Sequence, residues 1–232
     1  MASHSLLILC HEAPLALRWR EQLQPQPTLQ VKGFTNSPGA ARQMIAQHGV
    51  DLVLMELGLM ASSTNGAIHG LRGGPHADLP HVLVVGARLD DPLLLQALRG
   101  GADAYYVPGQ GSLVAAVQST LDGESPIEPD LARQVLHLFD SAAPSDAASA
   151  LAETPLQLTS AERKLLTQVL RGDTLEHIAD AETMSLNTLG LTVRGIYRKL
   201  RWLLRAGALS LEGGNPSGML ELQIRPPAGR NR

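Results

Sequence analysis

Short apolar runs alternate with amphipathic stretches along the first half of the chain. Five runs have the length and the aliphatic or aromatic content typical of strands: 5–10, 28–34, 51–56, 81–87 and 103–107. Each is followed by a stretch with helical spacing of apolar residues, at 13–23, 37–49, 66–74, 91–101 and 110–123. Five strand–helix units in a row predict an α/β fold, a doubly wound parallel sheet with helices on both faces.

One predicted strand ends on a single carboxylate, Glu56, inside the run VDLVLMELGLM of residues 50–60. A near-continuous apolar run is typical of a parallel strand that is buried on both faces. Open α/β sheets place their sites at the carboxyl ends of such strands, so Glu56 is a candidate functional residue.

Helix-start signals support the predicted alternation of strands and helices, since Ser37-Pro38 and Asp91-Pro92 each pair a capping side chain with a proline.

The second half of the chain has a different pattern. A helix is predicted over 129–140, and the Pro- and Ala-rich segment 141–157 is typical of a linker. Three helices joined by short connections then fit a helix-turn-helix unit, at 159–172, 174–182 and 185–204. We expect a further short helix over 206–211.

Composition and charge narrow the classes of protein. Hydrophobic content of 44% and charged content of 18% describe a soluble globular chain, with no apolar run near the roughly 18 residues of a membrane span. A single cysteine, Cys10, excludes an internal disulfide and fits a reducing cytoplasm. Residues 158–205 hold eight Lys/Arg against five Asp/Glu, whereas residues 1–123 hold seven against nine. This asymmetry predicts that the C-terminal part meets an anion.

The third helix of the helix-turn-helix unit carries the strongest functional signal. Residues 185–205 have no acidic side chain and five basic ones, Arg194, Arg198, Lys199, Arg201 and Arg205. The spacing of the arginines predicts one basic face, with an apolar face made of Leu189, Val193, Ile196 and Leu200. Such a helix suits DNA, because basic side chains neutralise phosphates while residues at the helix start read base edges. The alternative is a solvated basic face on an ordinary helix.

Residues 158–200 resemble the LuxR-type helix-turn-helix of the NarL/FixJ response regulators. The likeness rests on the opening Leu-Thr, Glu162-Arg163, Gly172, Ile178-Ala179, Ser185, Thr188 and the IYRKL motif of residues 196–200. The five strand–helix units upstream are similar to the receiver domain of that family. The resemblance implies a receiver-like domain at 1–123, an exit helix and linker at 124–157, a DNA-binding domain at 158–212 and a tail at 213–232.

The resemblance also implies partners, namely double-stranded DNA bound at a two-fold related site by a homodimer. DNA contacts are expected from Thr188, Leu191, Thr192, Arg194, Arg198, Lys199 and Arg201. The lysine that the family usually has early in this helix is replaced by Gly190, and glycine inside a helix costs about 1 kcal/mol relative to alanine. We therefore expect an unusual DNA sequence preference.

The receiver-like part departs from the family at its phosphorylation site. Family members use two acidic residues for Mg²⁺, an Asp phosphoacceptor, a Thr or Ser, and a Lys. The matching positions here hold His11 with Glu12, Glu56, Gly86 and Pro108. Mg²⁺ requires hard oxygen ligands, and Glu reaches one methylene further than Asp in a reaction governed by positioning. We therefore predict a pseudo-receiver that is not phosphorylated at this site and holds neither a metal nor a cofactor.

Some side chains have two interpretations. We interpret Glu56 as a structural or ligand-binding carboxylate, and the alternative is a mimic of the phosphorylated state. His11 is expected to be a solvated strand-end residue rather than the partner of a nearby carboxylate. Tyr105 is assigned to a dimer or ligand surface or to packing, Cys10 to packing, and Asp90-Asp91 to a helix cap.

The combined hypothesis is a cytoplasmic, non-enzymatic transcription regulator that binds DNA without Asp phosphorylation. Its signal would come from dimerisation, from a small-molecule ligand at the degenerate pocket, or from a protein partner. Two alternatives remain open. One is a receiver that accepts phosphate on a non-standard residue, and the other is a protein-interaction adaptor that has lost sequence-specific DNA binding.

Overall fold

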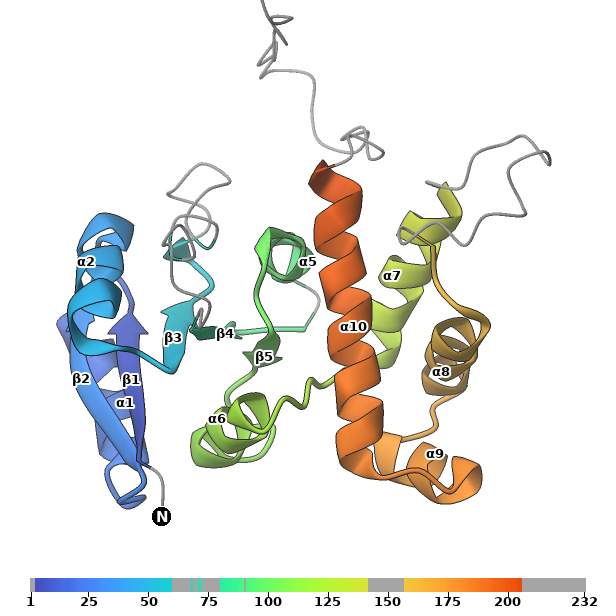
Figure 1. The fold of residues 1–232 in the computed structure, drawn as a ribbon, viewed down its shortest axis with the longest axis horizontal. Helices are drawn as coiled ribbons and strands as arrows, with labels where there is room; N and C mark the ends of the chain where they lie inside the picture. The colour runs from blue at the N-terminus through green and yellow to red at the C-terminus, as the bar shows by residue number, and fades with distance from the viewer. Residues whose placement is uncertain are drawn as a thin grey trace, which may run out of the picture.

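Five parallel strands form the sheet of the first half of the chain (Figure 1). The computed structural model describes residues 3–59, 68, 71, 80–89, 91–141 and 157–205, with residues 204 and 205 described by their backbone only. The strands are β1 (His4–Leu9), β2 (Leu29–Thr35), β3 (Leu52–Glu56), β4 (His81–Val85) and β5 (Ala104–Tyr106). Their order is β2-β1-β3-β4-β5, which is the order of flavodoxin-like doubly wound sheets. The predicted α/β class is confirmed.

Helices cover both faces of this sheet. They are α1 (Ala13–Leu23), α2 (Pro38–His48), α5 (Pro92–Gly100) and α6 (Leu113–Leu121). Consecutive strand residues point to opposite faces. Ile8 therefore packs on the face covered by α1 and α6, with Trp19, whereas Leu7 packs on the face covered by α2 and α5, with Leu98. Of the helix predicted over 66–74, only Ile68 and Leu71 are described, and both are buried.

Side-chain caps start these helices where the sequence predicts them. Ser37 Oγ accepts a hydrogen bond from the N–H of Ala40 at 3.4 Å, and Pro38 occupies the first helical turn of α2. Asp91 Oδ1 accepts from the N–H of Leu93 at 2.9 Å at the start of α5. The helix-cap interpretation of Asp91 is thus confirmed, whereas Asp90 lies outside the described residues.

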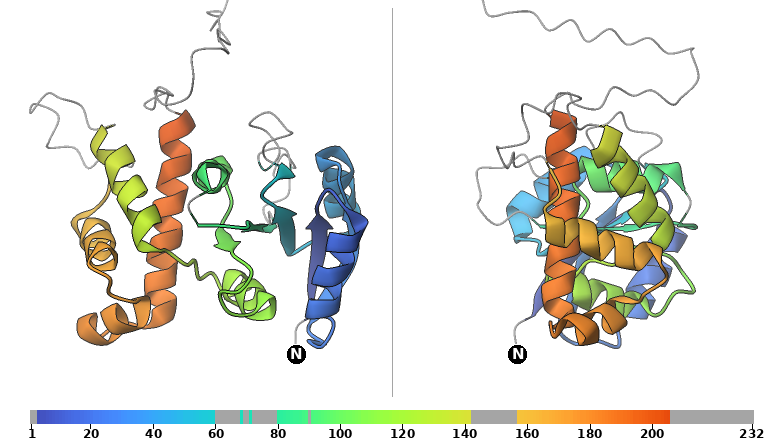
Figure 2. Two further views of the ribbon diagram at one scale, coloured as in Figure 1. Left: turned by 180° about the vertical axis from the view of Figure 1, so that it is seen from behind. Right: turned by 90° about the vertical axis from the view of Figure 1, so that its right-hand side faces the viewer.

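The second half of the chain is a group of helices packed onto the sheet layer. They are α7 (Pro129–Ser141), α8 (Ser160–Leu170), α9 (Leu175–Glu182) and α10 (Leu186–Arg205). α7 packs against α8, and α10 stands between these helices and α5 (Figures 1 and 2). Most of the predicted linker, the helix over 206–211 and the tail lie outside the described residues. We call residues 3–121 the sheet unit, 122–128 the connecting segment and 129–205 the helical unit.

The two units share one set of buried side chains. Leu98 of α5 belongs to the same core as Ile127 of the connecting segment, Leu131 of α7, and Val193 and Tyr197 of α10. α10 therefore contributes to the packing of the sheet unit as well as to that of its own three-helix group.

Candidate functional site

The third helix of the helix-turn-helix group, α10, begins at a capped turn. Ser185 Oγ accepts a hydrogen bond from the N–H of Thr188 at 3.1 Å, as the sequence predicts for this helix start. The apolar face is also where the sequence predicts it, because its four members are buried: Leu189, Val193, Ile196 and Leu200.

The basic residues of α10 do not share one exposed face. The side chains of Arg194 and Arg201 are only 12% and 22% exposed and face the sheet unit. Arg198 is exposed, whereas Lys199 Nζ donates to Glu162 Oε2 at 2.6 Å and to the carbonyl of Gln157 at 2.9 Å. Arg194, Arg198 and Arg201 keep the predicted helical spacing, but Arg194 and Arg201 face the sheet unit instead of solvent, because α10 packs against two layers at once.

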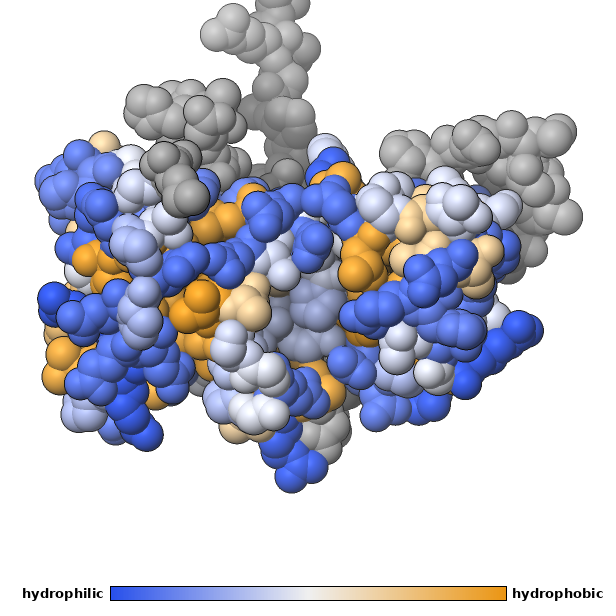
Figure 3. All heavy atoms as spheres, turned by 90° about the horizontal axis from the view of Figure 1, so that it is seen from below, coloured by the Kyte–Doolittle hydropathy of each residue, from blue (hydrophilic) through white to orange (hydrophobic). Residues whose placement is uncertain are grey.

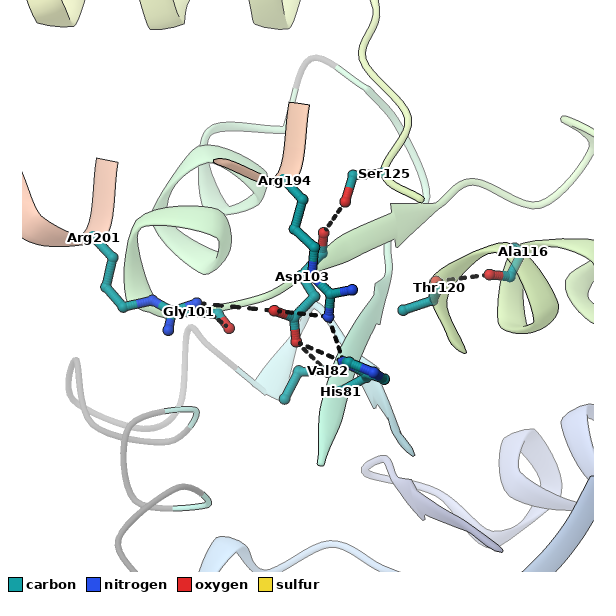
Figure 4. A network of polar contacts seen from close by, with 9 residues as sticks. All are labelled: His81, Val82, Gly101, Asp103, Ala116, Thr120, Ser125, Arg194 and Arg201. Carbon is teal, nitrogen blue, oxygen red and sulfur yellow. Dashed lines mark hydrogen bonds and ion pairs between the residues drawn. The ribbon is translucent and has the colours of Figure 1, made fainter. Parts of the chain in front are cut away.

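Asp103, at the start of β5, is the residue on which Arg194 and Arg201 converge (Figure 4). The residue is 7% exposed. Its Oδ1 lies 3.5 Å from Nη2 of Arg194 and 4.0 Å from Nη2 of Arg201, and its Oδ2 accepts from the N–H of Val82 at 2.9 Å. A buried carboxylate requires charged or hydrogen-bonding partners, and here α10 supplies two of them.

Each arginine makes a second polar contact with the sheet unit. Arg201 Nη2 donates to the carbonyl of Gly101 at 3.1 Å. Arg194 Nη2 donates to Nδ1 of His81, which stands next to Asp103 at the start of β4. A guanidinium has only donors, so Nδ1 of His81 is the acceptor in this contact. Each guanidinium group is therefore held by two contacts with the sheet unit, one of which is with Asp103.

Gly190 explains how closely α10 approaches the sheet unit. A Cβ at this position would lie 2.9 Å from both Cα and Cβ of Glu124, closer than such atoms approach in proteins. A Cβ at Gly123, whose φ is 91°, would lie 3.1 Å from Leu191. The sequence marks Gly190 only as a lost DNA contact. The structure gives a physical reason for the glycine, namely close contact with the connecting segment.

Tyr197 anchors the middle of α10. It is 1% exposed, and its hydroxyl donates to the carbonyl of Pro126 at 2.5 Å. Burial raises the pKa of Tyr197 well above its usual value, with further contributions from Tyr105 and Glu128. Burial also raises the pKa of Tyr105, which is 4% exposed. The burial of Tyr105 supports the packing interpretation over the dimer surface. We call the contacts of Gly190, Arg194, Tyr197 and Arg201 with the sheet unit and connecting segment the α10 interface.

The other predicted DNA contacts lie away from Asp103. Thr188 is exposed and its Oγ1 lies 2.8 Å from Ser185 Oγ, while Thr192 Oγ1 donates to the carbonyl of Thr188 at 2.9 Å. Leu191 is half exposed. With Arg198, these residues form the part of the predicted DNA contacts that the α10 interface leaves at the surface.

Two residues of the predicted degenerate pocket, His11 and Glu56, lie together at the carboxyl ends of β1 and β3. The N–H of His11 donates to Glu56 Oε2 at 2.8 Å, and His11 Nδ1 is 3.2 Å from the same oxygen. His11 is exposed at the strand end, as expected, and it also contacts the carboxylate that the alternative interpretation named. The contact with Glu56 forms because β1 and β3 are adjacent in the sheet.

The remaining pocket positions hold no substitute for the missing side chains. A Cβ at Gly86 would lie 2.8 Å from Cδ2 of Leu57, so Leu57 fills the space beside this residue. Pro108 and Glu12 are exposed, and Glu12 makes no side-chain cap at the start of α1. Among the described residues, no group of three or more His, Cys, Asp or Glu side chains is placed to hold a metal ion.

Cys10, next to this pocket, is buried as expected. Its Sγ donates to the carbonyl of Glu12 at 3.3 Å, and burial is the largest cause of its raised pKa.

In the part of the chain that the structure describes, no helix is long and apolar enough to cross a membrane.

Sequence reasoning missed Asp103, His81 and Tyr197. Asp103 and His81 stand at the start of predicted strands, each as the polar residue in front of an apolar run. The available signal was this position. A carboxylate at the start of a buried strand needs a partner, and no basic residue stands next to Asp103 in the sequence. Tyr197 was visible only as part of the IYRKL motif.

No protein-family model matches the chain, and no curated protein matches it. Solved structures of response regulators are similar to it. One is the receiver domain of NarL from Mycobacterium tuberculosis, with 18% identity, a TM-score of 0.46, and coverage of 53% of this chain and 99% of that one.

Two longer chains are similar over most of their length. ChrA, a response regulator of a heme-sensing two-component system, has 16% identity and a TM-score of 0.46, covering 90% of this chain and 100% of that one. RcsB, in a structure of two dimers bound to two parallel DNAs, has 12% identity and a TM-score of 0.47, covering 88% and 98%. The assignment of the fold itself rests on the strand order and helix packing described above.

Proposed function

We propose that the protein is a DNA-binding transcription regulator whose recognition helix, α10, is docked on the sheet unit until a signal releases it. The observation that carries the proposal is the pairing of Arg194 and Arg201 with the buried carboxylate of Asp103. α10 contains no acidic residue, and two of its arginines already bind an anion within the molecule. A DNA phosphate is also an anion, so DNA and Asp103 compete for the same side chains.

In the released state, the start of α10 enters the major groove. Thr188, Leu191 and Thr192 face base edges there, because the first turns of a recognition helix carry base contacts. Phosphates are bound by the basic residues further along the helix, Arg194, Arg198, Lys199 and Arg201. The DNA site is two-fold related and is bound by a homodimer.

The regulator works without phosphorylation of its receiver-like unit. The geometry that supports this part of the proposal is the pairing of Glu56 with His11, where the family has a metal-binding carboxylate, together with the Leu57 side chain beside Gly86. Incubation with acetyl phosphate and Mg²⁺ should therefore leave the mass of the intact protein unchanged. A stoichiometric increase by one phosphate would establish the alternative, a receiver that uses a non-standard acceptor.

Selection of genomic DNA fragments tests the DNA-binding proposal. Unmodified full-length protein and the variant Asp103→Asn are used in parallel, without a phosphodonor. We expect the best fragment to bind about a thousandfold more tightly than random DNA, the low end for specific binders, over a series of salt concentrations. Absence of any preference in both proteins contradicts the proposal, because the variant removes the competing carboxylate.

A protein-interaction adaptor is the second candidate function, and Gly190 favours it. At a position where the family has a lysine, α10 has no side chain and instead contacts Glu124. In an adaptor, α10 is a permanent part of the packing between the two units. DNA binding by Asp103→Asn would then be absent or independent of sequence, and Arg194→Ala would not change it.

A further inference from the structure

A cavity of about 280 Å³ lies where the two units meet, at the start of α10. It is lined by α6 and the loop before it, by the connecting segment, and by the first turns of α9 and α10. The lining residues that matter most are Tyr105, Ala115, Glu124, Glu176, Leu186 and Gly190. Figure 3 shows this side of the molecule, where the surface is hollowed between the sheet unit and the helical unit.

The charges that line the cavity have one sign. Glu124 and Glu176 supply carboxylates, and no Lys, Arg or His is among the described lining residues. Neither carboxylate forms an ion pair or a side-chain hydrogen bond with a residue in the described part of the chain. Tyr105 and Leu186 add apolar surface beside them. Glu124 is half-buried and Glu176 is exposed, so both carboxylates are accessible to a cation from solvent, and two like charges at one cavity attract a cation.

The two carboxylates come from opposite sides of the boundary. Glu124 belongs to the connecting segment and is seated against Gly190 of α10, where a Cβ would come within 2.9 Å of its Cα. Glu176 stands in the first turn of α9. The complete lining therefore exists only while α10 is docked on the sheet unit.

We propose that this cavity binds a small organic cation, a primary amine with a compact apolar body. The ammonium group pairs with the carboxylates of Glu124 and Glu176, and the apolar body contacts Tyr105 and Leu186. Small-molecule sites usually enclose ~300–1,000 Å³, so this volume suits a ligand at the small end of that range.

Binding of such an amine favours the docked arrangement. A ligand that binds one arrangement and not the other shifts the equilibrium by the factor 1 + [L]/Kd, so at one hundred times its Kd it lowers the undocked population about a hundredfold. The consequence for DNA rests on the proposed function, in which the amine weakens DNA binding without contacting DNA.

Three phenols of similar size and different charge test the proposal on the full-length protein. Tyramine carries an ammonium group, 4-ethylphenol is neutral, and 3-(4-hydroxyphenyl)propionate is an anion. Isothermal titration calorimetry should detect tyramine binding at a single site, with 4-ethylphenol at least about tenfold weaker and no detectable binding of the anion. Equal affinity for tyramine and 4-ethylphenol, or no binding of tyramine at millimolar concentration, overturns the proposal.

Variants locate the binding. Glu124→Gln and Glu176→Gln should each weaken tyramine binding at least about fivefold, and Ala115→Leu should block it because this exposed helix position lines the cavity. Ala46→Leu is the matched control, since it makes the same change at an exposed position of α2. Tyramine binding that all three cavity variants leave unchanged takes place elsewhere and also overturns the proposal.

The titrations contain no DNA, so their outcome is separate from that of the DNA-binding proposal. Tyramine binding with no DNA preference would leave the cavity assignment in place and remove the regulator. DNA preference without tyramine binding would leave the regulator in place and overturn the cavity assignment.

Discussion

Asp103 uses its two carboxylate oxygens in different ways. Oδ2 accepts the N–H of Val82 within the sheet unit, whereas Oδ1 faces Arg194 and Arg201 of α10. The first contact belongs to the fold of the sheet, and the second depends on where α10 lies. A substitution that keeps the first and removes the charge therefore separates the two roles.

Asp103→Asn should increase DNA affinity about tenfold, equivalent to ~1.4 kcal/mol. The amide oxygen still accepts the N–H of Val82, but the arginines lose their competing carboxylate. Fluorescence anisotropy with a selected DNA fragment at fixed salt measures the change. Asp130→Asn on α7 is the control, because it makes the same change of net charge at an exposed residue that pairs with Arg133. Equal affinities of the two variants would argue against competition by Asp103.

Glu56→Ala should leave DNA affinity within about twofold of the unmodified protein. Glu56 contacts His11, and Gly86 and Pro108 stand where the resemblance implies the Thr or Ser and the Lys that would sense a phosphate mimic. Loss of the hydrogen bond to the N–H of His11 should lower the free energy of unfolding by about 1 kcal/mol. Glu56→Gln keeps that acceptor and should be nearly as stable as the unmodified protein. A large loss of DNA affinity in both variants would instead support mimicry.

At this scale, the sequence could indicate residue types but not all of their partners. The residue types at the predicted pocket positions are visible because strand ends can be located from apolar runs. The contact between His11 and Glu56 depends on which strands are neighbours, and that order is a property of the whole sheet. Asp103 was hidden because its arginine partners lie about ninety residues further along the chain.

Two glycines of α10 differ in the space available for a side chain, so alanine substitutions at the two positions form a matched pair. A Cβ at Gly190 would meet the backbone of Glu124 at 2.9 Å, whereas a Cβ at Gly195 would have its nearest neighbour, Glu162 Oε1, at 3.9 Å. The first position is too close for a side chain, and the second is in ordinary contact. Alanine favours the helix by about 1 kcal/mol at either position, so the two substitutions differ mainly in the α10 interface.

Gly190→Ala should weaken the docking of α10 and raise DNA affinity about tenfold, because the backbone of Glu124 has to move away. Gly195→Ala should raise the melting temperature and leave DNA affinity unchanged. Differential scanning calorimetry and DNA titration of both variants provide the comparison. If Gly190→Ala behaves like Gly195→Ala in both measurements, the close contact does not control the position of α10.

The sequence is most informative at the scale of the element. Each predicted strand lies within two residues of an observed one, and α1 has the predicted limits, because apolar period and capping residues are local properties. The two-sided burial of α10 could not be predicted in the same way. Its basic residues have the spacing of a DNA-binding face, and nothing in that spacing reveals that Arg194 and Arg201 contact another unit.

The whole molecule is joined by the core that runs from α5 to α10, and two tyrosines lie in its middle. Tyr197 donates to Pro126 of the connecting segment, and Tyr105 of β5 is buried near it. Burial disfavours the charged phenolate of both residues. The position of α10 is therefore linked to the protonation of groups from both units.

Stability should fall at alkaline pH. The pKa values of Tyr105 and Tyr197 are raised in the folded protein, so the folded state holds these protons more tightly than the unfolded state. The associated stability is complete below the unfolded pKa of about 10 and is lost as the pH rises above it. Melting temperatures between pH 9 and 11.5 measure this loss. The double variant Tyr105→Phe/Tyr197→Phe should show a smaller fall, and an identical fall would assign the effect to other groups.

Residues of α10 that are proposed to contact DNA also contact the rest of the molecule, and this has a consequence for how the protein's DNA targets evolve. Arg194 contacts Asp103 and His81, and Leu191 lies against Gly123, so a mutation at either residue alters regulation together with DNA preference. Thr188, whose hydrogen bonds are to Ser185 and Thr192, carries no such double constraint. Under the proposed function, new target sequences are therefore acquired first through Thr188, while Arg194 is kept by selection on the unbound state.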